Sequence, residues 1–308
     1  MKRVFLFPGQ GSQSVGMLAD FLAEHSVVRD TFSEASDTLG FDVFDVTQNG
    51  PVETLNATAV TQPALLTASI ALWRLWLAQR GVMPDFFAGH SLGEYSALVA
   101  AESLTFADAL RLVRKRGELM QSAVPADEGA MAAVIGLSDE QVKQACAEAA
   151  PAFCVPVNFN APGQVVIAGR PDGVEKAGDI AKSLGAKRVL PLAVSAPSHC
   201  ELMRPAAELL AQELAMIEFR APSAPIVQNV DALAHTNVDF LRTNLVEQLY
   251  QPVLWVKTIE NLVKGQVQVG YECGPGKVIT GLVKRIDSNL SMHHFSSLAD
   301  FTSAVASA

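Results

Sequence analysis

A G-x-S-x-G pentapeptide constrains this chain more than any other feature of its sequence. It reads Gly89-His90-Ser91-Leu92-Gly93 and lies between an apolar run at 86–88 and a helix-forming run at 94–101. In a strand-turn-helix setting, the serine sits on a strained turn above the carboxyl ends of a sheet, and the N–H of Leu92 points at an oxyanion formed beside it. The pattern predicts an α/β fold with Ser91 as a nucleophile. A turn without chemistry is the alternative, and the bare pentapeptide would leave the two about equal.

Composition places the chain among globular proteins. Its 308 residues are 49% hydrophobic, enough for one large α/β domain or for such a domain with an insertion. The formal net charge of −9 argues against general affinity for nucleic acid or an anionic membrane. We therefore expect no nucleic-acid partner and no membrane association.

The cysteines and the start of the chain indicate a reducing compartment. The four cysteines are scattered without C-x-x-C spacing, which suggests neither a metal site nor a disulfide framework. The first apolar run is too short for a signal peptide, and no later segment has membrane-spanning length. We expect a cytoplasmic protein.

A loop near the N-terminus is predicted to face the serine. Residues 3–7 form an apolar run of strand length, which Pro8 ends before the glycine-containing loop 9–13. Ligands bind at the carboxyl ends of strands in open α/β sheets, so the N–H near Gln10 is a candidate for the second half of an oxyanion hole. Phosphate binding and a plain turn are the alternatives.

Arg116 occupies an unusual place on a helix that we predict over residues 105–123. It falls in the middle of the apolar face, between Ala109 and Leu112. An uncompensated guanidinium there would be very costly, so Arg116 must meet an anion. Two partners stay open: a protein carboxylate in a buried ion pair, or a substrate carboxylate at the base of a pocket.

The pattern changes in the middle of the chain. The expected elements are strands at 130–136, 154–160, 164–168 and 187–194 and helices at 138–150 and 172–184. This β-α-β-β-α-β order is the signature of a ferredoxin-like unit. We therefore expect a ferredoxin-like α+β subdomain at 126–195, inserted into a hydrolase-like catalytic domain with a mostly parallel sheet at 1–125 and 196–308. A cleft between them would be faced by Asn158 and Asn160.

His199 has the setting of a general base. Ser198 and Glu201 have capping-box spacing, which predicts a helix with His199 in its first turn. The positive end of the helix dipole would oppose protonation, leaving a neutral imidazole to accept the proton of Ser91. His90 adjoins the serine, but neighbours on a strand point to opposite faces.

Motifs spread over the whole chain share the order and spacing of one enzyme family. They are Phe7-Pro8-Gly9-Gln10-Gly11-Ser12-Gln13, Gln62-Pro63-Ala64, the run from Gly89 to Ala97, Arg116, Pro197-Ser198-His199, Gln248 and Gly274-Pro275-Gly276-Lys277. From residue 3 to about 286 the chain resembles the bacterial malonyl-CoA:acyl carrier protein transacylases. The glycine turn at 274–277 lacks Walker spacing, so a plain strand-to-helix turn is the better reading of it than a phosphate loop.

The resemblance implies an S-malonyltransferase of fatty acid biosynthesis. Such an enzyme moves malonyl from malonyl-CoA to the phosphopantetheine thiol of acyl carrier protein, with CoA as product and no cofactor or metal. The roles that the resemblance implies are Ser91 as nucleophile, His199 as general base, the main-chain carbonyl of Gln248 as the partner of His199, the N–H groups of Gln10 and Leu92 as oxyanion hole, and Arg116 on the malonyl carboxylate.

Several alternatives stay open. A serine hydrolase such as an acyl-CoA thioesterase would use Ser91 and His199 with water as acceptor, and Arg116 discriminates against it. A non-catalytic module that binds a carrier protein is the other class. The residues before His199 differ from those of related polyketide synthase domains, which leaves tolerance for methylmalonyl open. We expect a monomer, with an acidic carrier protein docking on basic residues near the cleft: Lys187, Arg188, Lys277, Lys284 and Arg285.

Overall fold

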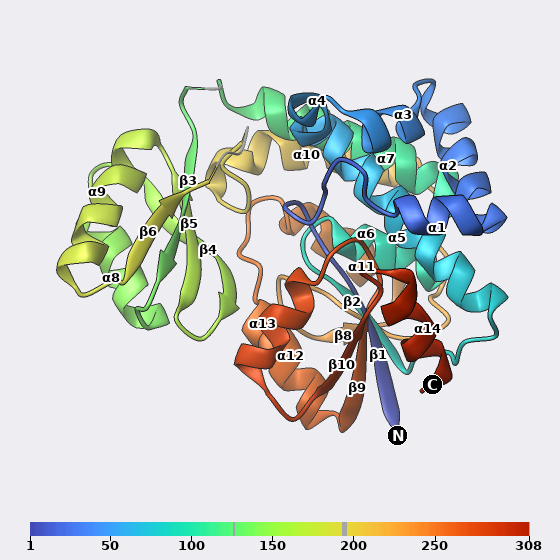
Figure 1. The fold of residues 1–308 in the computed structure, drawn as a ribbon. Coiled ribbons are helices and arrows are strands. Elements are labelled where there is room, and N and C mark those ends of the chain that lie inside the picture. Colours follow the sequence, from blue (N-terminus) through green and yellow to red (C-terminus); the bar gives the residue numbers. More distant parts are fainter. Residues whose placement is uncertain (126, 193–195, 308) are drawn as a thin grey trace.

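The computed structural model describes residues 1–125, 127–192 and 196–307. The chain forms a larger α/β unit that contains both termini and a smaller α+β unit built from its middle third (Figure 1). This is the predicted fold class. The predicted domain boundaries at 126 and 195 fall on residues outside the described part of the chain, so the boundaries stay a prediction.

The larger unit is organised around one sheet. Its strands within the described residues are β1 (Lys2–Phe7), β2 (Phe86–Gly89), β7 (Ile226–Val227), β8 (Ala234–His235), β9 (Val267–Glu272) and β10 (Ser291–His294). They lie in the order β10-β9-β1-β2-β7-β8, and every neighbouring pair except β7–β8 is parallel. Parallel strands bring their carboxyl ends to one edge, so the loops after β1, β2 and β9 meet there.

Helices cover both faces of this sheet. They are α1 (Ala19–Glu24), α2 (Ser26–Leu39), α3 (Val43–Asn49), α4 (Val52–Asn56), α5 (Thr58–Ala78), α6 (Gly93–Ala100), α7 (Phe106–Ala123), α10 (Arg204–Ala215), α11 (Val238–Glu247), α12 (Trp255–Lys264), α13 (Val278–Ile286) and α14 (Leu298–Ala306), with a 3₁₀ helix, η1 (Glu201–Met203). Phe5 and Phe7 of β1 join the core formed with α5 to α7, whereas Val4 and Leu6 join the core formed with α12 and α13. Because β1 is a central strand that is buried on both faces, its residues form a continuous apolar run near the start of the chain. None of the helices in the described ranges is long and apolar enough to cross a membrane.

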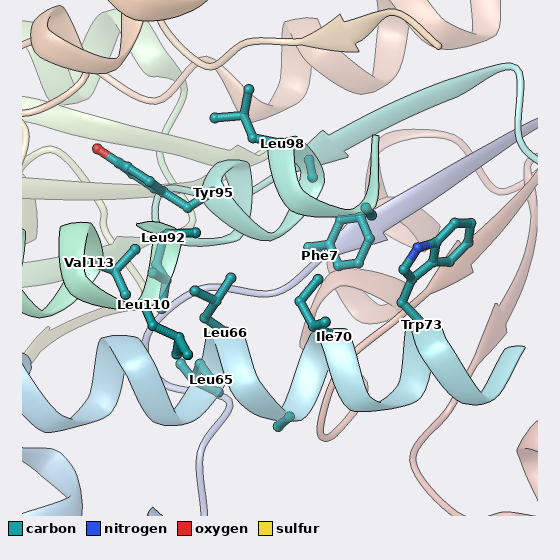
Figure 2. Packing of buried hydrophobic residues seen from close by; sticks show 14 of the residues in the cluster. Phe7, Leu65, Leu66, Ile70, Trp73, Leu92, Tyr95, Leu98, Leu110 and Val113 are labelled. Atoms are coloured by element: carbon teal, nitrogen blue, oxygen red, sulfur yellow. The ribbon is translucent and has the colours of Figure 1, made fainter. Parts of the chain in front are cut away.

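Helix α5 is the centre of the main core. It is buried on almost every side, and Figure 2 shows its residues Leu66, Ile70 and Trp73 beside Phe7 of the sheet. The helix begins at Thr58, so Thr61 lies in its first turn. The Thr61 hydroxyl donates to the carbonyl oxygens of Leu55 and Ala57 instead of accepting from a helix N–H, so it ties the preceding turn to the helix.

The smaller unit has the predicted ferredoxin-like topology. Its elements are β3 (Ala130–Ile135), α8 (Asp139–Glu148), β4 (Cys154–Ala161), β5 (Gln164–Gly169), α9 (Pro171–Ser183) and β6 (Arg188–Pro191). The strand order is β4-β5-β3-β6 with antiparallel pairing, and both helices pack their apolar faces on this sheet. The last residues of the strand predicted at 187–194 lie outside the described part of the chain. Val253 joins the two units because its N–H donates to Val157 at 2.8 Å and its carbonyl accepts from Phe159 at 3.0 Å.

The helix predicted to start at Ser198 does not form there. His199 lies in a turn, with a φ of 65°, and is followed by η1 and then by α10. The capping box does not form because the Glu201 carboxylate pairs with Arg204, with an Nε–Oε2 distance of 2.7 Å. The Ser198 hydroxyl donates to the carbonyl of Ala196. The predicted location of His199 in a first helical turn, and the dipole argument drawn from it, are therefore wrong.

Candidate active site

The loop between β2 and α6 is a sharp elbow with Ser91 at its tip. Ser91 has a φ of 51°, a left-handed conformation that L-residues rarely adopt. A Cβ on Gly89 would lie 1.9 Å from the carbonyl carbon of Gly93, and a Cβ on Gly93 would lie 2.0 Å from the oxygen of Phe7. Both glycines are therefore required by close approach of strand, elbow and helix, as the pentapeptide predicted.

His199 lines the same cavity as Ser91 and lies within hydrogen-bond distance of it. Its Nε2 lies 2.8 Å from Ser91 Oγ, and its Nδ1 lies 2.6 Å from the main-chain oxygen of Gln248. A carbonyl oxygen can only accept, so Nδ1 carries the proton and Nε2 is left to accept from the serine hydroxyl. This geometry is that of a nucleophile with an oriented base, and a carbonyl occupies the position where serine hydrolases usually carry a carboxylate.

The imidazole of His199 is neutral at ordinary pH. Its side chain is 3% exposed, and burial together with the positive charge of Arg116 lowers the pKa of His199 to about 3. A neutral base is the state that the sequence analysis expected. Its cause is burial and a neighbouring guanidinium rather than a helix terminus.

Arg116 lies at the base of the same site. It is 1% exposed, and its Nη2 donates to Ser91 Oγ at 3.2 Å and to Gln248 Oε1 at 2.9 Å. Its Nη1 donates to Gln62 Oε1 at 2.8 Å. No carboxylate in the described ranges forms an ion pair with this guanidinium. The ion-pair alternative for Arg116 is thus not realised in that part of the chain, and neutral oxygens surround a full positive charge.

A cavity of about 350 Å³ opens over the serine, between the two units. Residues of the larger unit that line it include Gln10 and Leu92, and the smaller unit contributes Asn158 and Asn160, as expected. The N–H groups of Gln10 and Leu92 donate to no acceptor in the described residues. Two unsatisfied donors beside a nucleophile are what an oxyanion needs.

His90 lines the cavity, so the prediction that it points to the face opposite Ser91 is wrong. Its Nε2 lies 2.7 Å from Asn160 Oδ1. The alternation rule fails here because the strand ends at Gly89 and the chain turns at the serine. The G-x-S-x-G pattern predicts this turn, and so it could have indicated that strand alternation does not apply to His90.

Asn229 supports the elbow and had no signal in the sequence. Its Oδ1 accepts from the Ser91 N–H at 2.7 Å, and its Nδ2 donates to the Gly89 carbonyl at 2.7 Å. These bonds join positions 138 and 140 residues apart in the chain. They hold the strained turn from both sides.

The described residues contain no group of three or more His, Cys, Asp or Glu side chains that could hold a metal ion. All four cysteines are buried and free, with the Cys146 and Cys154 sulfurs 3.8 Å apart. The polar side chains that line the cavity are two serines, two imidazoles, a guanidinium and several amides.

Comparison with known proteins agrees with this geometry. The model of the acyl transferase domain family matches residues 4–294. The malonyl CoA-acyl carrier protein transacylase of Escherichia coli K12 is 59% identical over 288 residues, which is 93% of each chain. A malonyl-transacylase solved in complex with its type II PKS acyl-carrier protein is 51% identical, with a TM-score of 0.98 and full coverage of both chains.

A second solved structure, an acyl carrier protein S-malonyltransferase from Vibrio cholerae, is 52% identical with a TM-score of 0.96. It covers 98% of this chain and is itself covered to 99%. Matches of this length and identity leave no large region of the chain outside the alignment. The chain belongs to the malonyl CoA-acyl carrier protein transacylase family.

Proposed function

We propose that this protein transfers the malonyl group from malonyl-CoA to the phosphopantetheine thiol of acyl carrier protein, through an ester on Ser91. The observation that carries the proposal is the convergence of two groups on one oxygen: His199 Nε2 at 2.8 Å and Arg116 Nη2 at 3.2 Å from Ser91 Oγ. The first can remove the hydroxyl proton. The second is a cation in reach of an acyl group bound to that oxygen.

The first half-reaction begins when Ser91 Oγ attacks the thioester carbonyl carbon and gives its proton to His199 Nε2. The negative charge that develops on the carbonyl oxygen is stabilised by the N–H groups of Gln10 and Leu92. When the tetrahedral intermediate collapses, the C–S bond breaks and the CoA sulfur takes the proton from His199. The second half-reaction reverses these steps with the carrier protein's thiol.

The carbonyl partner of His199 suits this exchange. The main-chain oxygen of Gln248 fixes the imidazole tautomer, yet as a neutral group it stabilises an imidazolium less than a carboxylate would. The exchange between a thioester and a serine ester needs only modest activation of the attacking hydroxyl or thiol. Attack by water needs a stronger base, so the site favours transfer over hydrolysis.

Arg116 gives the proposal its substrate class. A buried guanidinium surrounded by amide and hydroxyl oxygens retains the capacity to bind a carboxylate, and malonyl is an acyl group that ends in one. The substrates supply all the reacting groups, so the proposal includes no cofactor. The expected monomeric state and cytoplasmic location are part of the proposal and rest on the sequence.

Intact mass spectrometry tests the covalent step. Protein mixed with malonyl-CoA and quenched should gain the mass of one malonyl group, and the Ser91→Ala variant should gain none while it folds normally. Addition of carrier protein should clear the adduct and produce malonyl-carrier protein. A wild-type protein that turns over malonyl-CoA by ping-pong kinetics but releases free malonate at the same rate with or without carrier protein would be a thioesterase, the alternative class.

A further inference from the structure

A buried carboxylate lies behind the active site and touches none of the reacting atoms. It belongs to Glu94, on the first turn of α6, and is fully buried. We propose that Glu94 is a positioning residue, which fixes the side-chain amide of Gln248 and through it orients Arg116. This proposal rests on the malonyl transfer proposed above and adds a residue that selects its substrate.

The Glu94 carboxylate receives three hydrogen bonds. Gln228 Nε2 donates to Oε1 at 2.9 Å, and the Asn229 N–H and Gln248 Nε2 donate to Oε2 at 2.9 and 3.0 Å. Each of these three partners presents an N–H donor to the carboxyl group. The ionised form accepts all of them and has no proton of its own to place among these donors, so the surroundings favour a carboxylate.

The orientation of the Gln248 amide follows from this arrangement. Its Nε2 faces Glu94 Oε2 and the carbonyl of Ser91, at 3.0 and 3.1 Å, and its Oε1 accepts from Arg116 Nη2 at 2.9 Å. Rotation of the amide by half a turn would place its oxygen against the carboxylate and its NH₂ against the guanidinium. An acceptor would then face an acceptor at Glu94, and a donor would face a donor at Arg116, so an ionised Glu94 excludes the rotated state.

Two functional groups depend on Gln248. The same residue offers its side-chain oxygen to Arg116 and its main-chain oxygen to His199 Nδ1, at 2.9 and 2.6 Å. A Gln248 that is free to rotate would present a donor to Arg116 and displace the guanidinium from its place beside Ser91. The grip on a substrate carboxylate is therefore expected to suffer more than the attack on the thioester.

The charge of Glu94 is sensitive to pH. Burial raises the pKa of Glu94 to about 7, against the opposing effect of its three donors. The other charged or titratable groups around it are Tyr95 on the same helix, Arg116 on α7, Asp231 after β7, and His199 beyond Gln248. Of these, Tyr95 and His199 have pKa values of about 12 and about 3, so neither changes charge near neutral pH. His235 lies beyond Asp231, with its Nε2 2.7 Å from Asp231 Oδ2.

The experiment compares malonyl-CoA with acetyl-CoA in the first half-reaction, followed as CoA release over a range of pH. Using this step keeps the acceptor thiol out of the profile. For the wild type, we expect malonyl transfer to fall as the pH drops through about 7, while acetyl transfer falls less. We call this fall the acid limb of the malonyl profile. Glu94→Gln removes the charge and replaces one of the two acceptor oxygens by an NH₂ group. The ratio of malonyl to acetyl transfer rates should drop by roughly tenfold or more, and the acid limb should flatten.

Matched variants separate positioning from packing. Glu272→Gln removes another fully buried carboxylate, which does not line the cavity, and should leave the ratio and the acid limb unchanged. His235→Asn should also leave the acid limb in place. If Glu94→Gln fails to fold, Gln228→Met removes one donor from Glu94 and should move the acid limb to higher pH.

Three results would overturn the proposal. They are an equal fall of malonyl and acetyl transfer in Glu94→Gln with an unchanged acid limb, an acid limb that follows His235, and an acid limb that Gln228→Met does not move. The proposed function fails in a different way, because a wild type that forms no malonyl adduct contradicts it before any variant is compared.

Discussion

Two strands of the central sheet end in a tight turn followed by a helix, and only one of these turns is open to a ligand. After β9, the Glu272 carboxylate accepts from the N–H groups of Ile279 and Thr280 at the start of α13, at 2.9 and 2.7 Å. After β2, the Leu92 N–H before α6 has no acceptor in the described part of the chain. The turn after β9 is already occupied by the protein's own carboxyl group, which is why its Gly-Pro-Gly-Lys sequence is a plain turn.

The difference shows what makes a strand-turn-helix connection a reactive one. Both turns rely on glycine at points of close approach: a Cβ on Gly274 would lie 2.4 Å from Pro8 Cγ, and a Cβ on Gly93 would lie 2.0 Å from the oxygen of Phe7. Tight geometry is therefore common to both. The β2 turn adds a hydroxyl at its tip, a base beside that hydroxyl, and the Leu92 N–H, which meets no acceptor among the described residues.

Removal of the base should have the largest effect on the open turn. We expect His199→Ala to lower malonyl transfer by roughly 10⁴-fold, because the serine proton then has no acceptor. The melting temperature should change little. Single-turnover measurement of CoA release checks the rate, and a variant that retains most of its activity would show that another group takes the proton.

Closing the elbow sterically should cost stability as well as activity. In Gly93→Ala, the new methyl group would meet the backbone of Phe7, so the free energy of unfolding should fall by about 3 kcal/mol or more. Gly281→Ala in α13 is the control. Its Cβ meets nothing within 4 Å, so it should stabilise the protein by about 0.5 to 1 kcal/mol. Urea unfolding of both variants checks this, and equal effects would show that close approach does not distinguish the elbow.

Loss of the cation should alter selectivity more than rate. Arg116→Ala removes charge-assisted hydrogen bonds worth roughly 1.5–3 kcal/mol, so malonyl transfer should fall by about 10- to 150-fold. Acetyl has no carboxylate and leaves the wild-type guanidinium without an anionic partner, so the variant should handle acetyl as well as the wild type or better. Rates measured side by side for the two substrates check this. A fall by the same factor for both would make Arg116 a structural residue.

Sequence predicted those parts of the site whose signals are local. The five adjacent residues of the pentapeptide predicted the elbow, and the apolar face of a single helix predicted that Arg116 is a buried cation. The small unit followed from its order of strands and helices, which short-range apolar patterns reveal. In each case neighbouring residues carry the information that fixes the structure.

Long-range contacts explain what the sequence could not predict. The spacing of Ser198 and Glu201 permits a capping box, but Arg204 takes the carboxylate, so His199 lies in a turn. The buried amides that hold the elbow come from a segment more than 130 residues away. Their partners depend on how the sheet assembles, and an asparagine such as Asn229 more often serves in a turn.

The smallest effect concerns the occupied turn. Burial raises the pKa of Glu272 above its usual value. The stability linked to this group is fully present below the unfolded pKa and is lost as the pH rises through the folded pKa. Glu272→Gln keeps one acceptor for α13 but turns an NH₂ toward a backbone donor, so we expect it to cost about 1 kcal/mol on the acid side. Because the variant cannot ionise, its disadvantage should shrink as the pH rises. Unfolding free energies measured at several pH values check this. A disadvantage that grows with pH would mean that the two capping bonds outweigh burial, and that this turn, like the elbow, binds an anion better than it tolerates a neutral group.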